Sequence, residues 1–151
     1  MTSVRSAVPG DADALAALRW EFRAGKRPAI EERGAFVARA AAWMRRELES
    51  GRWRAWVAEQ DGGLVGQVWL CPIDKIPNPN DERERHAYLS NLYVMPAARG
   101  GVGTRLLETA IAWADAHDID TVLLWPTERS RPLYARHGFA ATDRFLGRPL
   151  H

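Results

Sequence analysis

The segment Met95–Leu107, MPAARGGVGTRLL, joins two stretches with different hydrophobic patterns. The nine residues before it, HAYLSNLYV (86–94), are rich in aromatic and apolar side chains and predict a β-strand. From Thr104 to about Ala116, apolar residues recur at three- and four-residue steps, which predicts a helix. The buried face of that helix is expected to carry Leu106, Leu107, Ala110, Ile111 and Ala114. The segment is therefore the turn of a strand–turn–helix unit.

The turn is rich in glycine and contains an arginine. Gly100, Gly101 and Gly103 lie within four residues, directly after Arg99. The first amides of a helix have no partner within the helix, and the helix dipole adds partial positive charge there. Glycine lets the backbone approach a ligand closely, and an arginine can pair with phosphate oxygens. The glycines alone would fit an ordinary tight turn equally well, but together with Arg99 they favour an anion-binding loop.

Two common phosphate-binding patterns do not fit this loop. The Walker pattern requires a lysine and then serine or threonine after its last glycine, whereas Gly103 is followed by Thr104 and Arg105. The dinucleotide pattern requires a third glycine at a step that the sequence does not supply. The loop also follows a late strand rather than the first one. These observations disfavour nucleotide hydrolysis and hydride transfer.

The rest of the chain alternates short apolar runs with amphipathic stretches, as expected for one mixed α/β domain over residues 1–151. A continuous apolar run at 121–125 (TVLLW) predicts a strand buried on both faces, which would lie parallel to 86–94. Polar residues and three prolines predict a long loop over 71–85. The remaining predicted strands are 4–8, 54–59, 64–70 and 139–146, and the remaining helices are 11–25, 31–49 and 130–136.

Composition disfavours several other classes of protein. The net charge is only +2 and acidic residues are interleaved with the basic ones, so there is no basic stripe for a nucleic acid, although the pI is about 9.0. No apolar run approaches the roughly 18 residues of a membrane span, and the N-terminus lacks the apolar stretch of a signal peptide. The single cysteine, Cys71, has no recognisable catalytic partner, and the four histidines show no metal-ligand spacing. We expect a cytoplasmic protein that binds no metal, nucleic acid or membrane.

Three stretches of the chain resemble the GNAT superfamily of N-acetyltransferases. VRSAVPGDADALAAL (4–18) resembles the first strand, turn and helix of that family. LSNLYVMPAARGGVGTRLL (89–107) resembles the strand, loop and helix that hold acetyl-CoA, and RPLYARHGF (131–139) resembles the late Leu-Tyr-x-x-x-Gly-Phe motif. The last two motifs together are specific, and the order of elements matches over nearly the full length. The resemblance implies a mixed, mostly antiparallel sheet with a splayed central strand pair, flanking helices and acetyl-CoA as co-substrate.

The loop is one residue shorter than the family pattern Arg/Gln-x-x-Gly-x-Gly/Ala. Counting back from Gly103 places Gly101 at the first glycine and Ala98 where the arginine belongs. Counting forward from Arg99 instead places Val102 at a glycine position, where a positive φ would disfavour valine. The first register also keeps the apolar pair that follows at the family's buried positions, so we adopt it. In this register Arg99 is shifted by one residue, while the loop amides keep their role.

The resemblance also implies which residues contact acetyl-CoA. Backbone groups of Leu92, Tyr93 and Val94 would face the pantetheine arm, with a bulge near Ser90 or Asn91 opening the sheet. The pyrophosphate would lie on the loop, whose candidate residues are Arg99, Gly100, Gly101, Val102, Gly103 and Thr104. Thr127 stands where the family often has asparagine, and both a cofactor contact and a cap for the last helix are compatible with it.

The implied reaction is direct attack of an amine on the acetyl thioester. An alkylamine with a pKa of about 10.4 must lose a proton to attack, and a thiolate with a pKa of about 8.5 leaves more readily when it receives one. The resemblance assigns Tyr134 as the acid near the sulfur, with a packing role as the alternative. Glu84 is the candidate proton acceptor just before the cofactor strand, and His86, Tyr88 and Glu21 are further candidates.

The acceptor is expected to be the amine of a small molecule or an amino-acid-like compound. Trp20, Glu21 and Asn91 are its candidate binding residues, near the splayed strands and the first two helices, where an acidic side chain would suit a cationic amine. Most of the seven tryptophans are expected in the core. A non-catalytic acyl-CoA-binding sensor is the alternative, which the short loop favours and Tyr134 opposes. The sequence specifies no oligomeric state, and a homodimer is compatible with it.

Overall fold

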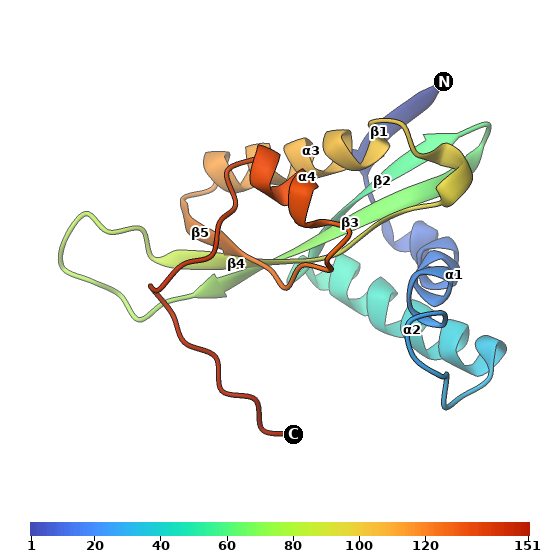
Figure 1. Cartoon of the computed structure of the whole chain (residues 1–151), viewed down its shortest axis with the longest axis horizontal. Coiled ribbons are helices and arrows are strands. Elements are labelled where there is room, and N and C mark those ends of the chain that lie inside the picture. Colours follow the sequence, from blue (N-terminus) through green and yellow to red (C-terminus); the bar gives the residue numbers. More distant parts are fainter.

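The computed structural model describes residues 1–151 as three layers, with a five-stranded sheet between two pairs of helices (Figure 1). The strands, in sheet order, are β1 (Thr2–Ser6), β2 (Arg54–Gln60), β3 (Gly63–Asp74), β4 (Arg85–Val94) and β5 (Ile119–Leu123). The helices are α1 (Ala12–Arg23), α2 (Arg33–Ser50), α3 (Val102–Ala116) and α4 (Arg131–Arg136), with single 3-10 turns at Pro9–Asp11 and Pro96–Ala98. None of the helices combines the length and the hydropathy that a membrane span requires. Neighbouring strands are antiparallel except that β5 runs parallel to β4, which confirms the mixed, mostly antiparallel α/β fold.

Alternating side chains along β3 place one hydrophobic core on each face of the sheet. Val68 and Leu70 belong to a cluster with α3 and α4, whereas Trp69 belongs to a cluster with α1 and α2. The expected buried face of α3 is confirmed, because Leu106, Leu107, Ala110 and Ala114 are buried and Ile111 is partly buried. Each fully buried leucine of this kind stabilises the fold by about 1.5–3 kcal/mol.

The connection between β3 and β4 is shorter than predicted. Residues 71–74 continue β3 and Arg85 begins β4, so the loop spans only residues 75–84. Lys75 ties the loop to β5, because its ammonium donates a hydrogen bond to the carboxylate of Asp120 at 2.9 Å. Figure 1 shows this loop projecting from the end of the sheet opposite the turn between β4 and α3.

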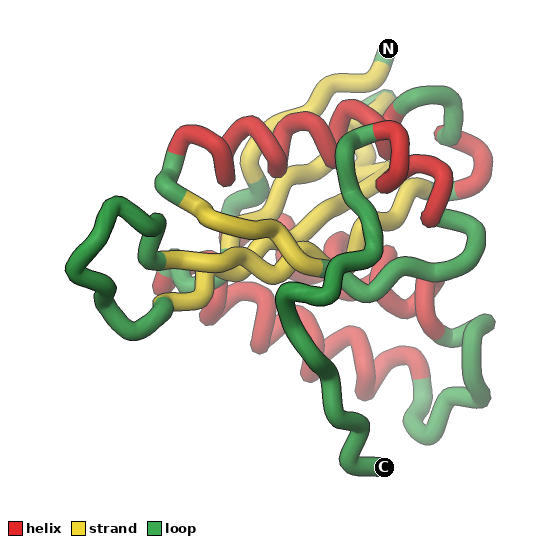
Figure 2. The backbone as a smooth tube through the Cα atoms, turned by 60° about the vertical axis from the view of Figure 1, so that its left-hand side comes forward, coloured by secondary structure: helices red, strands yellow, loops and turns green.

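The strand expected over 139–146 does not form. The segment pairs with no strand, and Figure 2 shows it as part of the loop that runs from α4 to the C-terminus. The hydroxyl of Thr142 accepts a hydrogen bond from the amide of Arg144 at 3.1 Å, which makes a local turn. The guanidinium of Arg144 then donates to the hydroxyl of Thr121 at 3.4 Å. The prediction is wrong because local side-chain hydrogen bonds compete with the weak apolar alternation of this segment.

Candidate active site

A β-bulge interrupts β4 at Ser90 and Asn91. Tyr93 pairs with Gln67 and Ser90 pairs with Trp69, so three steps along β4 match two steps along β3. Asn91 accommodates the extra residue with a positive φ of 58°. Successive side chains of a strand normally point to opposite faces, but Ser90 and Asn91 line one cavity together. The bulge expected at this position is confirmed.

Beyond the bulge, β4 and β5 separate. Their parallel pairing ends at Tyr88 and Leu123, although β4 continues to Val94. The amide of Met95 donates a hydrogen bond to the carbonyl of Val65 on the β3 side at 2.8 Å. The N–H and C=O groups of Val94 therefore point to the opposite side, where β5 is absent. This geometry confirms the splayed strand pair.

The three residues of β4 that were predicted to contact the cofactor do not all direct their backbone groups to the same side, because this direction alternates along a strand. Leu92 lies two residues before Val94, so its backbone groups point to the same open edge. Tyr93 instead pairs with Gln67, and its ring stacks on Phe22 of α1 with the centroids 5.0 Å apart. Leu92 thus offers its backbone groups and Val94 its N–H group to an extended ligand, since Arg99 already donates a hydrogen bond to the Val94 carbonyl. Tyr93 instead joins the strand to α1.

The loop after β4 presents a continuous run of free amides. Gly100 and Gly101 have φ values of 137° and 93°, and Gly101 caps α3, which begins at Val102, two residues earlier than predicted. The first hydrogen bond of the helix runs from the amide of Arg105 to the carbonyl of Gly101 at 3.1 Å. The amides of residues 100–104 make no hydrogen bond within the chain. Together with the helix dipole, this run suits a pyrophosphate group.

The loop geometry supports the register in which Gly101, not Val102, occupies the first glycine position. Val102, the first residue of α3, is 5% exposed, and its side chain packs in the hydrophobic core. A Cβ atom at Gly103 would make only ordinary contacts, the nearest at 3.8 Å to Val94. Arg99 is exposed, and its Nε donates a hydrogen bond to the carbonyl of Val94 at 3.2 Å. Arg99 therefore folds back over the end of β4 and ties the loop to it.

Tyr134 lies on α4, beside this loop. Its side chain is 8% exposed and belongs to the same hydrophobic cluster as Val94 and Val102. Phe139 packs against the Tyr134 ring edge to face, with the centroids 5.5 Å apart. Burial raises the pKa of Tyr134 to about 12, because the phenolate would lose its hydration. Tyr134 is therefore protonated at neutral pH and can act as a hydrogen-bond donor.

Thr127 holds the start of α4. Its hydroxyl donates a hydrogen bond to the hydroxyl of Ser130 at 2.9 Å and accepts one from the amide of Ser130 at 3.2 Å. Its carbonyl accepts a further hydrogen bond from the amide of Arg131 at 3.2 Å. These bonds support the capping role for Thr127, which positions the helix that carries Tyr134.

A cavity of about 510 Å³ lies beside the bulge, on the face of the sheet that α1 and α2 cover. Ser90 and Asn91 contribute its polar groups from β4. Its aromatic residues are Phe36, Trp43, Trp53 and Trp69, and its charged residues are Arg19, Arg39 and Arg46. The cavity therefore adjoins the point where the strands separate, next to the open edge of β4.

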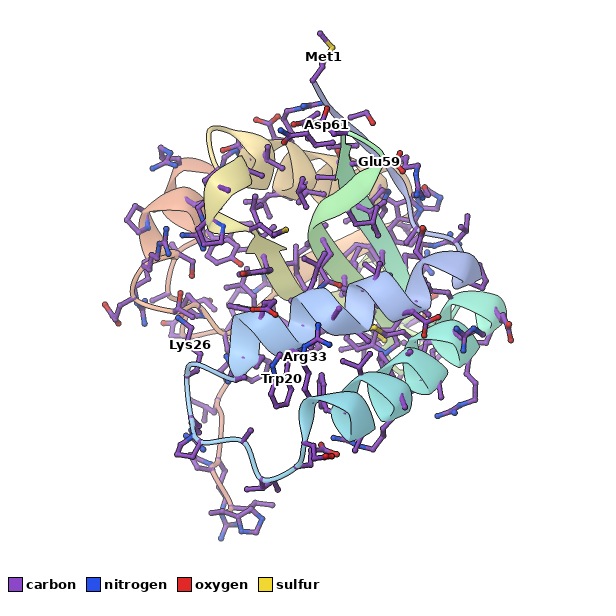
Figure 3. The ribbon with its side chains drawn as sticks, turned by 90° about the vertical axis from the view of Figure 1, so that its right-hand side faces the viewer. Met1, Trp20, Lys26, Arg33, Glu59 and Asp61 are labelled. Atoms are coloured by element: carbon purple, nitrogen blue, oxygen red, sulfur yellow. The ribbon has the colours of Figure 1, made fainter.

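The three residues predicted to bind the acceptor lie in different places. Asn91 lines the cavity. Trp20 lies just behind the lining, with its ring centroid 5.7 Å from that of Phe36, and Figure 3 shows it between α1 and α2. Glu21 is exposed and outside the lining. No carboxylate lines the cavity, so this cavity lacks the acidic side chain that would suit a cationic amine.

Glu84 lies at the opposite end of β4 from the loop and the cavity. Asn91 is seven residues further along the chain, about 23 Å at roughly 3.3 Å per residue of strand. The carboxylate of Glu84 is held by the amide of Asn78 at 3.0 Å. Tyr88 lies closer to the bulge, and its hydroxyl donates to that of Ser90 at 3.3 Å. The position of Glu84 opposes its assignment as the proton acceptor.

Arg19 was not anticipated from the sequence as a residue of this site. It follows Ala12, Leu15 and Ala16 at seven-, four- and three-residue steps, and so continues the buried stripe of α1. A charged residue on such a stripe is uncommon, and this is the signal that would have found it. In the structure Arg19 is half-buried, and its Nη1 donates to Oδ1 of Asn91 at 3.3 Å.

Comparison with known proteins agrees with this architecture. The sequence model of the acetyltransferase (GNAT) family matches residues 14–139, whereas no curated protein matches the chain. A GCN5-related N-acetyltransferase from Ralstonia eutropha JMP134 is 26% identical, with a TM-score of 0.78 over 99% of both chains. A predicted acetyltransferase from Clostridium acetobutylicum, solved with acetyl-CoA, is 25% identical, with a TM-score of 0.80 over 99% of this chain and 97% of its own.

A more distant structure shares the fold. An aminoglycoside acetyltransferase from an uncultured soil metagenomic sample is 21% identical, with a TM-score of 0.69 over 100% of this chain and 99% of its own. The family match spans most of the chain and includes the bulged strand, the glycine-rich loop and the helix of Tyr134. The chain therefore belongs to the GNAT family of acetyltransferases, which use acetyl-CoA as the acetyl donor.

Proposed function

We propose that the protein is an N-acetyltransferase that moves an acetyl group from acetyl-CoA to the amine of a small-molecule or amino-acid-like acceptor. Three features at the end of β4 carry the proposal: the free amides of residues 100–104, the open backbone edge at Leu92 and Val94, and the buried Tyr134. The amides suit the pyrophosphate of the donor, and the open edge suits its extended pantetheine arm. Tyr134 serves as the general acid at the thioester.

The transfer forms one bond and breaks one. The amine nitrogen attacks the thioester carbon, the C–S bond breaks, the amine loses a proton and the sulfur gains one. Because Tyr134 is protonated at neutral pH, its hydroxyl donates a hydrogen bond to the sulfur, transfers its proton to the leaving thiolate and is then reprotonated from solvent. The paired hydroxyls of Tyr88 and Ser90, beside the bulge, pass the proton of the amine toward solvent.

Acetyl-CoA is expected to raise the Tm of the protein. A ligand at 100 times its Kd that binds only the folded state adds about 2.7 kcal/mol of stability. For a domain of this size, that corresponds to a rise in Tm of roughly 5–10 °C. Thermal unfolding at increasing acetyl-CoA concentrations measures the shift. ATP, which has no pantetheine arm, is the control and should shift the Tm less. An unchanged Tm at millimolar acetyl-CoA would contradict coenzyme A binding.

Turnover separates an enzyme from an acyl-CoA-binding sensor. Both would show the thermal shift, but only the enzyme would release coenzyme A thiol when an acceptor amine is added. Thiol release is therefore measured across amines of different charge and size, with a reaction lacking amine as the background. Saturable binding of acetyl-CoA without amine-dependent release would favour the sensor.

A further inference from the structure

Every charged side chain in the lining of the cavity is an arginine. Arg39 forms an ion pair with Glu31, which neutralises it. Arg19 and Arg46 line the same cavity, and neither lies in any ion pair of the chain. The cavity is thus electropositive, and its unpaired cations have no counter-ion within the protein.

Arg19 is the cation that reaches the bulge. Its Nη1 donates to Oδ1 of Asn91 at 3.3 Å, and its guanidinium carbon lies 5.7 Å from the centroid of the Phe22 ring. Burial lowers the pKa of Arg19, and the charge of Arg23 lowers it further, yet a guanidinium keeps its charge at physiological pH. One neutral amide uses only one of its five N–H donors. The others are available to an anion in the cavity.

Aromatic side chains form the apolar wall of the cavity. The ring centroids of Trp43, Trp53 and Trp69 are 5.7–6.2 Å apart. Trp69 is held in place because its Nε1 donates to Oε1 of Gln67 at 2.8 Å. Rings packed in this way form a stable surface for an apolar group. The volume of about 510 Å³ lies within the range of small-molecule sites, about 300–1,000 Å³.

We propose that the acceptor is an α-amino acid with a large apolar side chain, whose carboxylate binds Arg19 and whose side chain lies against the tryptophans. Its amine then faces the bulge. Because Arg19 contacts Asn91 of the bulge, a carboxylate bound to Arg19 lies next to the bulge that the amine faces in this proposal, and the two groups are adjacent in an α-amino acid. The inference rests on the proposed function, since it names the acceptor of that same site. Amines that carry further positive charge and no carboxylate are expected to be poor acceptors here.

Three acceptors test this charge preference at saturating acetyl-CoA. L-Phenylalanine is compared with L-phenylalaninamide, in which an uncharged carboxamide replaces the carboxylate and the side chain is the same. The third compound is spermidine, a polycation without a carboxylate. We expect kcat/KM, measured by thiol release, to be at least about 10-fold higher for the acid than for the amide, with no turnover of spermidine. Basicity alone would favour the amide, because its amine is less basic and more of it is unprotonated at neutral pH. A preference for the acid would therefore have to come from its carboxylate.

Each outcome of this comparison has a separate meaning. A preference for the amide or for spermidine would overturn the inference and leave acetyl transfer to amines intact. Binding of acetyl-CoA without acetylation of phenylalanine, leucine or tryptophan would also overturn it. Loss of the thermal shift with acetyl-CoA would instead overturn the proposed function.

Arg19→Gln tests the assigned residue. We expect it to raise the KM for L-phenylalanine by about 10- to 100-fold and to change the KM for the amide by less than about threefold. Arg23→Gln is the matched control, because Arg23 lies on the same helix, 5.6 Å from the same Phe22 ring, but outside the cavity. It should change neither value. Equal effects of Arg19→Gln on acid and amide would show that Arg19 only supports the bulge.

Discussion

Replacing Tyr134 by phenylalanine is expected to lower kcat by about 100- to 10,000-fold, with the Kd for acetyl-CoA close to that of the wild type. The change removes one oxygen and keeps the buried ring, so the free energy of unfolding should change by less than about 1 kcal/mol. Without the hydroxyl, the sulfur leaves without the hydrogen bond and the proton that Tyr134 supplies. Thiol release at saturating acetyl-CoA and acceptor measures kcat.

Phe139→Leu is the matched control for the packing of Tyr134. Phe139 contacts the same ring edge to face, with the centroids 5.5 Å apart, and has no polar group. The substitution disturbs the packing but keeps the Tyr134 hydroxyl, so stability should fall by about 1–2 kcal/mol while kcat stays within about threefold. If both variants lose kcat equally, or if Tyr134→Phe is as fast as the wild type, the role of Tyr134 is packing alone.

Valine at Gly101 is expected to weaken acetyl-CoA binding. Gly101 has a φ of 93°, a conformation that a β-branched residue avoids, so the loop must rearrange. Rearrangement turns amides of residues 100–104 away from the pyrophosphate. Each redirected amide should raise the Kd by about 10- to 100-fold, because a hydrogen bond to a charged group contributes about 1.5–3 kcal/mol. Isothermal titration calorimetry with acetyl-CoA measures the change.

Gly51→Val controls for the backbone strain of this substitution. Gly51 caps the C-terminus of α2 with a φ of 73°, and a Cβ atom there would meet nothing within 4 Å, as is also true at Gly101. Both variants should therefore lose a similar amount of stability, but only Gly101→Val should lose affinity for acetyl-CoA. Similar weakening in both variants would mean that general destabilisation, and not the loop amides, explains the loss.

Much of the fold was predictable because its signals are local. The buried face of α3 followed from the spacing of Leu106, Leu107 and Ala110 in the sequence. The start of that helix was misplaced by two residues, because the cap at Gly101 depends on its positive φ, which apolar spacing does not reveal. The strand over 139–146 failed for a similar reason, since the hydrogen bond within residues 142–144 is invisible to an apolar pattern.

The candidate site, like the fold, was predictable only where its signals are local in the sequence. The glycine-rich loop and Tyr134 lie in contiguous motifs, and the free amides follow from a helix that starts inside such a loop. The cavity beside the bulge depends instead on how α1 packs against β4. Arg19 and Asn91, which meet there, are 72 residues apart in the chain. The distance of Glu84 from the bulge was also not predictable, because it depends on where along β4 the bulge falls, which only the pairing with β3 determines.

The most direct test of acetyl transfer counts both products of one reaction. The protein is incubated with acetyl-CoA and a panel of amino acids and other amines, the free coenzyme A thiol is titrated, and the acetylated amine is quantified by mass spectrometry. Direct transfer to an amine predicts that the two products appear in equal amounts and fall together in Tyr134→Phe. Thiol release without an acetylated amine, or bound acetyl-CoA with neither product, would contradict it.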